Sequence, residues 1–118
     1  MMKRSDVDLR EKLVLELSYQ FMKNMTRDEY FIFAKGIFAY LIPYKNNGLT
    51  EKDMFSIINP EIYHGQYLKM DTEEIFGMRL ETLLNELIAY CGTPIFWDSD
   101  FDDYIKKWDD YYKMGYFL

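Results

Sequence analysis

Apolar side chains recur every three or four residues along most of the chain, which is the spacing of an amphipathic α-helix. The first such stretch begins at Ser5, a residue type that caps helix N-termini, and ends before Asn24, where the spacing breaks. Its apolar stripe follows at intervals of four residues and consists of Leu9, Leu13, Leu17 and Phe21. The pattern therefore predicts one amphipathic helix at the start of the chain.

A second helix is predicted to begin at Thr26. The run Thr26-Arg27-Asp28-Glu29 is a capping box, in which the threonine hydroxyl and the glutamate carboxylate each accept from a free backbone N–H of the first turn. Apolar residues then cover almost the whole circumference, so we expect this helix to lie centrally. Pro43 is expected to end it at or just before Ile42, because the residue before a proline disfavours helical geometry.

The stretch from residue 43 to residue 70 is less regular. Asn46-Asn47-Gly48 predicts a turn, and Thr50 begins a short helix with acidic residues in its first turn. Asn59-Pro60 is expected to stop that helix. Residues 61–70 fit either another short helix or an ordered loop.

Two further helices are predicted in the C-terminal half. One opens at Asp71-Thr72-Glu73-Glu74 and is closed by Gly92, and the other is capped by Asp98 or Ser99. The apolar stripe of the first comprises Phe76, Leu80, Leu83, Leu84, Leu87, Ile88 and Cys91. That of the second comprises Phe101, Tyr104, Ile105, Trp108, Tyr111 and Tyr112.

No run of residues alternates convincingly between apolar and polar, so no strand is predicted. The 118 residues are enough for one domain that buries a core without metal or disulfide. We therefore expect an all-α fold, a compact single-domain helical bundle of four main helices plus one or two short helices over residues 1–118. The N-terminus does not resemble a targeting signal, and the longest apolar run, residues 30–42, is too short to span a membrane. A cytoplasmic protein is expected.

Residues that carry chemistry are scarce. The chain has one histidine, His64, and one cysteine, Cys91, neither with neighbours at ligand spacing, so we expect no metal site. No phosphate-binding or catalytic motif is present, and the protein is predicted not to be an enzyme and to need no cofactor. Cys91 lies on the apolar stripe of its helix and is expected to be buried as a small hydrophobic residue. A single cysteine also indicates a reducing compartment.

Acidic residues are concentrated in the second half of the chain. The net charge is −6, which argues against a general nucleic-acid binder and against docking on anionic lipid. Residues 98–110 contain six aspartates and two lysines. This face fits a solvated surface stabilised by pairs such as Asp102–Lys106, Asp103–Lys107 and Asp109–Lys113. The alternative is a face that docks a basic partner.

Tyrosine is abundant, with 11 in the chain, and is common at protein interfaces because it combines contact area with a polar tip. Tyr63 and Tyr67 fall in the irregular segment, where either an interface or packing under a loop is consistent with them. Tyr112 lies in the acidic segment.

A small, acidic, tyrosine-rich helical protein without catalytic equipment is similar in kind to bacterial immunity proteins of nuclease colicins and of contact-dependent growth inhibition systems. The resemblance rests on the segment DSDFDDYIKKWDD and the aromatic content. It implies a tight, one-to-one complex with a cognate basic toxin domain, often an RNase or DNase, whose active site is blocked. The candidate partner-binding residues are Asp102, Asp103, Asp109 and Asp110, with Tyr63, Tyr67 and Tyr112 as aromatic anchors.

Two other classes remain open. One is a phage-type inhibitor or nucleic-acid mimic, whose carboxylates replace phosphates on a nucleic-acid-binding enzyme. The other is a homo-oligomeric helical adaptor, in which the apolar tail Tyr116-Phe117-Leu118 is buried in a dimer.

Overall fold

The computed structural model describes residues 4–115, apart from the side chains of residues 4, 5, 60 and 61. Within these residues the fold consists of helices and contains no strand, which confirms the all-α class. The helices are α1 (Arg4–Glu16), α2 (Tyr19–Met22), α3 (Arg27–Asn46), α4 (Glu51–Ile58), the π-helical segment η1 (Asn59–Tyr63), α5 (His64–Thr72), α6 (Glu74–Ile88) and α7 (Phe101–Lys113). The expected count of four main helices is not confirmed. The tail at residues 116–118 lies outside the described part of the chain.

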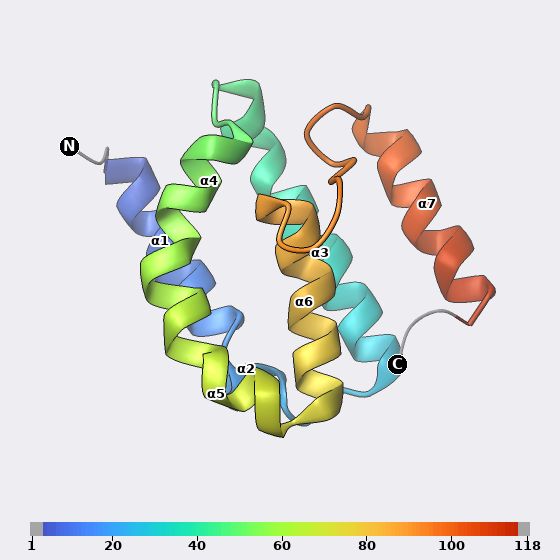
Figure 1. Ribbon diagram of the computed structural model, residues 1–118. Helices are drawn as coiled ribbons and strands as arrows, with labels where there is room; N and C mark the ends of the chain where they lie inside the picture. Colours follow the sequence, from blue (N-terminus) through green and yellow to red (C-terminus); the bar gives the residue numbers. More distant parts are fainter. Residues whose placement is uncertain (1–3, 116–118) are drawn as a thin grey trace.

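Helices α3 and α6 run through the middle of the molecule (Figure 1). Helices α1, α4 and α5 lie to one side, and α7 lies on the other, where it contacts α3. A core of apolar side chains joins these layers, and its aromatic part lies between α3 and α7: the ring of Phe38 is 5.1 Å from that of Tyr104 and 5.7 Å from that of Trp108, centre to centre. This aromatic cluster positions the acidic last helix. None of the helices described is both long and apolar enough to cross a bilayer.

The N-terminal stripe is divided between two helices. Leu9, Leu13 and Leu17 are fully buried as predicted, but α1 ends at Glu16 and α2 begins after Ser18. The Ser18 hydroxyl accepts a hydrogen bond from the Phe21 N–H, which is the bond of an N-cap. Because α2 runs in a new direction, a different side chain faces the core. Phe21 is 43% exposed, and its neighbour Met22 is buried instead.

The two prolines do not end their helices as predicted. Helix α3 passes through Pro43 to Asn46, because its last turn is held from outside: the Lys45 ammonium donates to the carbonyl oxygens of Phe96 (2.8 Å) and Ser99 (3.0 Å). At Pro60, α4 continues into η1 and α5 without a break. The wider i→i+5 turn of a π-helix accommodates a residue that has no N–H.

This continuity also moves the next boundary. Residues 61–70 are helical, which was one of the two predicted alternatives, and α5 extends to Thr72. Asp71 and Thr72 therefore belong to the end of α5. The prediction that they open the next helix is wrong. Helix α6 begins at Glu74, with Glu73 as an N-cap residue that makes no side-chain cap bond.

Helix α6 ends earlier than Gly92. It ends at Ile88, and Ala89 takes a left-handed conformation with φ 57° and ψ 45°. The chain then folds back over the last turn, where the Asn85 side-chain oxygen accepts from the Cys91 N–H at 3.2 Å. Cys91 consequently lies outside the helix and is exposed, so its predicted burial is wrong.

Replacing Ala89 with glycine is expected to stabilise the protein by about 1 kcal/mol, because a left-handed conformation is strained for an L-residue with a Cβ and not for glycine. The same substitution at Ala39, an exposed position within α3, supplies the control. There it should destabilise by about 1 kcal/mol. Urea unfolding of both variants would test whether Ala89 is left-handed. Changes of the same sign in the two free energies of unfolding would refute it.

Candidate functional site

The N-cap of the acidic helix α7 is Asp100, whose carboxylate accepts from the Asp103 N–H at 3.4 Å. Asp98 and Ser99, the predicted caps, precede it. The Ser99 hydroxyl instead donates to the Ile95 carbonyl oxygen at 2.5 Å and shapes the preceding loop. Asp102 and Asp103 occupy the first turn, where the helix dipole favours negative charge.

The inner edge of α7 is tied to α3 by charged and aromatic contacts. Asp109 forms an ion pair with Lys35 (Oδ1 to Nζ, 2.9 Å), and its side chain remains 41% exposed. The Tyr112 ring lies 4.2 Å from the ring of Phe31, and the Arg27 guanidinium lies 4.0 Å above it. Two of the residues predicted to bind a partner, Asp109 and Tyr112, therefore make contacts that hold α7 in place.

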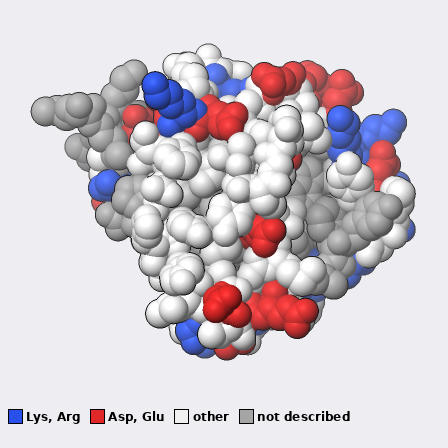
Figure 2. Space-filling model, viewed as in Figure 1, with Lys and Arg blue, Asp and Glu red and all other residues white. Residues whose placement is uncertain are grey.

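The outer face of α7 carries the remaining predicted carboxylates. Asp102, Asp103 and Asp110 are exposed, and none of these side chains forms an ion pair or hydrogen bond with any described residue. The expected pairs with lysines four residues away are not formed, and Asp109 pairs with Lys35 in place of Lys113. A shallow hollow of about 490 Å³ lies on this face, lined by Asp98, Asp100, Asp103, Lys106, Lys107 and Asp110. Figure 2 shows acidic side chains gathered over the start of α7.

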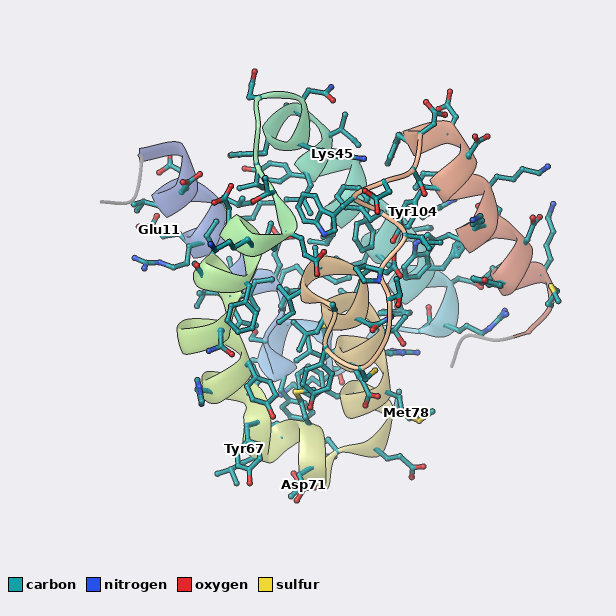
Figure 3. The ribbon with its side chains drawn as sticks, turned by 45° about the horizontal axis from the view of Figure 1, so that its top comes forward. Glu11, Lys45, Tyr67, Asp71, Met78 and Tyr104 are labelled. Atoms are coloured by element: carbon teal, nitrogen blue, oxygen red, sulfur yellow. The ribbon has the colours of Figure 1, made fainter. Side chains whose placement is uncertain are left out.

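The two tyrosines of the middle segment lie elsewhere. Tyr63 is half-buried in η1, with its ring 5.3 Å from that of Tyr90 and 6.4 Å from that of Tyr67, which is 54% exposed. Tyr67 points outward from α5, on the side of the molecule away from α7 (Figure 3). The structure thus brings Tyr63 and Tyr67 together but separates them from the acidic face.

A cleft between α6 and α7 was not predicted. It has a volume of about 480 Å³, and the residues lining it include Met78, Glu81 and Glu86 from α6 and Tyr104, Trp108 and Tyr111 from α7. Sequence periodicity marked Tyr104 and Trp108 only as core residues. The cleft exists because the loop at residues 89–100 separates the two helices, and periodicity contains no information on that separation.

The Tyr104 side chain extends from α7 toward the middle of the molecule, at the inner end of this cleft (Figure 3). The residue is 1% exposed, and its hydroxyl is buried without a hydrogen bond. Burial, and next the negative charge of Glu86, raises the pKa of Tyr104 far above its usual range, so the hydroxyl stays neutral.

Glu86 fixes the loop that closes one side of the cleft. Its Oε1 atom accepts from the backbone N–H groups of Ile95 and Phe96, both at 3.1 Å. At the rim, the Cys91 thiol donates to Glu81 Oε1 at 3.3 Å, and partial burial together with this carboxylate raises the pKa of the thiol. Cys91 is therefore a protonated, poorly nucleophilic thiol at neutral pH. Nowhere in residues 4–115 do three or more His, Cys, Asp or Glu side chains gather where they could hold a metal ion.

Compared with known protein families, curated proteins and solved structures, the chain shows no match. Its function is therefore inferred from the acidic face of α7 and the cleft beside it.

Proposed function

We propose that this protein is an immunity protein: a stoichiometric inhibitor that binds a cognate basic bacterial toxin domain, an RNase or DNase, one to one in the cytosol and blocks its active site. Inhibition of this kind requires binding alone, with no catalytic step and no cofactor. The proposed contact surface is the acidic outer face of α7, with Asp102, Asp103 and Asp110, together with Asp98 and Asp100 just before the helix.

The observation that carries the proposal is the lack of internal pairing on this face. A merely solvated helix would be expected to neutralise its aspartates with the lysines one turn away. Here the carboxylates of Asp102, Asp103 and Asp110 contact no cation among the described residues. Such carboxylates can pair with lysines and arginines of a partner without first breaking internal ion pairs. The aspartates outnumber the two lysines on this face, and its net negative charge also accelerates association with a positively charged protein.

The anchoring of α7 supports the same function. The Asp109–Lys35 ion pair and the packing of Tyr112 on Phe31 fix the helix before any partner binds. A preformed surface loses less conformational entropy on association than a mobile one, which favours a tight complex. We accordingly assign Asp109 and Tyr112 to positioning α7. Tyr63 and Tyr67 form a separate patch, which a partner could contact only by extending beyond α7.

Reversing two charges on the outer face tests the proposal. The double variant Asp103→Lys/Asp110→Lys is expected to weaken the complex at least tenfold at low salt, with a smaller effect at high salt, because exposed charges are screened. The matched control is Glu11→Lys/Asp71→Lys, which changes the net charge equally at exposed positions away from α7 (Figure 3). This control should bind within about threefold of the original protein, since its effect is limited to long-range screened charge.

The partner for this experiment is a basic toxin-like domain encoded by a neighbouring gene, co-expressed with the tagged protein and captured at low and high salt. Circular dichroism would verify that both variants are folded. Equal weakening of both double variants would contradict a contact at α7 and leave net charge as the only determinant. If the protein forms a dimer and captures no partner, the inhibitor hypothesis is wrong and the homo-oligomeric adaptor is favoured. If it captures several nucleic-acid-binding enzymes in a salt-sensitive manner, the nucleic-acid mimic is favoured.

A further inference from the structure

The α6–α7 cleft contains polar groups whose hydrogen bonds are incomplete. The Tyr104 hydroxyl is buried and has no partner in hydrogen-bond geometry, although the side chains of Glu86 and Trp108 lie close to it. Glu86 beside it accepts both of its hydrogen bonds at Oε1, and its Oε2 atom accepts none from the described residues. Leaving a polar group buried and unpaired is unfavourable, so a group that supplies the missing donors is bound favourably.

The charges around the cleft favour a cationic donor. Glu86 lies close to Tyr104, Glu81 is exposed, and both carboxylates line the cleft. Lys107 also lines the cleft, but it is exposed, so water screens its charge. The two unpaired oxygens, of Tyr104 and Glu86, are both able to accept hydrogen bonds. A ligand with several N–H donors and a positive charge satisfies both.

The aromatic walls select the shape of that cation. Tyr111 is 45% exposed on α7, and Trp108 lines the cleft beside it. A planar guanidinium stacks on aromatic faces and spreads its donors in a plane, whereas an ammonium is a compact, strongly hydrated charge. The apolar stem of an arginine side chain would cover Met78, an exposed residue that also lines the cleft.

We propose that the α6–α7 cleft binds the guanidinium of an arginine side chain, with Tyr104 and Glu86 accepting its hydrogen bonds. That the arginine belongs to the inhibited toxin domain rests on the proposed function, but the recognition of the guanidinium does not. The cleft lies beside the acidic face of α7, with Lys107 lining both hollows, so one basic partner can reach both.

Titration with N-acetyl-L-argininamide tests the proposal without any partner. We expect binding in the millimolar range, followed by tryptophan fluorescence and by NMR shifts of the backbone amides of Asn85, Ile95 and Lys107. N-acetyl-L-citrullinamide has nearly the same shape but no charge, and it should bind at least fivefold more weakly. N-acetyl-L-lysinamide should also bind more weakly. Equal binding of the arginine and citrulline probes, or no binding of either, would overturn the proposal.

A pair of tyrosine variants identifies the hydroxyl involved. Tyr104→Phe removes an unpaired hydroxyl, so it should raise the melting temperature while lowering argininamide affinity at least threefold. Tyr30→Phe is the matched control, because the Tyr30 hydroxyl is equally buried but donates to the Arg79 carbonyl oxygen at 2.9 Å. It should lower the melting temperature and leave affinity unchanged. A lower melting temperature for Tyr104→Phe would show that its hydroxyl is already bonded and would contradict the site.

The two proposals fail separately. If argininamide binds but charge reversal on α7 leaves partner capture unchanged, the cleft is a guanidinium site and the inhibitor surface is wrong. If charge reversal weakens capture but argininamide does not bind, the acidic face is supported and the cleft is refuted.

Discussion

Replacing Gly77 with alanine should destabilise the protein by about 2–3 kcal/mol, through overpacking at the contact between α5 and α6. Gly77 is buried in the first turn of α6, and a Cβ at this position would overlap the carbonyl oxygen of Met70. That oxygen belongs to the backbone of α5, which cannot turn aside as a flexible side chain would. Only Glu73 separates the two helices, so relief requires moving one helix against the other.

Gly36 provides the matched control for this substitution. It lies in the interior of α3, and a Cβ there would have no neighbouring atom within 4 Å. Alanine is the better helix former, so Gly36→Ala should stabilise the protein by about 0.8–1 kcal/mol. Urea unfolding would measure both changes. If Gly77→Ala were also stabilising, that result would contradict the close contact between α6 and the Met70 carbonyl oxygen.

The features that the sequence predicted correctly depend on neighbouring residues. The capping box at Thr26 forms as expected, and Thr50 begins a helix as predicted, because every cap bond at these two positions joins residues three apart. The stripe at Leu9, Leu13 and Leu17 is buried, since helical periodicity alone places those side chains on one face. The helical class of the fold follows from the same local information.

The features that the sequence missed depend on residues far apart in the chain. Pro43 lies inside α3 because Lys45 is bound to carbonyl oxygens of the loop more than 50 residues later. Asp109 pairs with Lys35, 74 residues away, and not with the nearby lysine that periodicity suggested. Spacing along the sequence indicates which nearby side chains could pair. Which pair forms depends on the tertiary packing.

The candidate site shows the same division. Helical periodicity correctly placed Asp102, Asp103 and Asp110 on an exposed face, because it assigned the opposite face to the core. It had no means of separating Tyr63 and Tyr67 from that face. The cleft depends on the course of the loop after α6, which follows from the early end of the helix at Ala89 and from two backbone bonds to Glu86.

Arg79 is expected to be a second site of large effect: Arg79→Met should destabilise the protein by about 2 kcal/mol. The residue is only 7% exposed, and its guanidinium donates to the Met25 carbonyl oxygen at 2.7 Å. The cation also lies 5.0 Å from the centre of the Tyr30 ring. Burial lowers the pKa of Arg79, but an arginine starts so high that it stays charged throughout the usual pH range.

Two opposing effects determine the size of that loss. The first is favourable, because methionine removes the burial of a charge. The second is unfavourable, because the Met25 carbonyl oxygen loses its charged donor and, with it, the hydrogen bond between α6 and the segment before α3. We expect the second effect to dominate, because hydrogen bonds to charged groups contribute about 1.5–3 kcal/mol. Arg79→Lys keeps the charge but not the planar donor set, and should give an intermediate loss.

Arg10 on α1 is the control for this series. Its side chain makes no hydrogen bond or ion pair with the described residues, so Arg10→Met should change the free energy of unfolding by less than about 0.5 kcal/mol. Urea unfolding of the three variants would separate the specific contact from the loss of a positive charge. Equal losses of stability at Arg79 and Arg10 would attribute the effect to net charge. A loss of stability confined to position 79 would show that the Arg79 guanidinium holds α6 against the segment before α3.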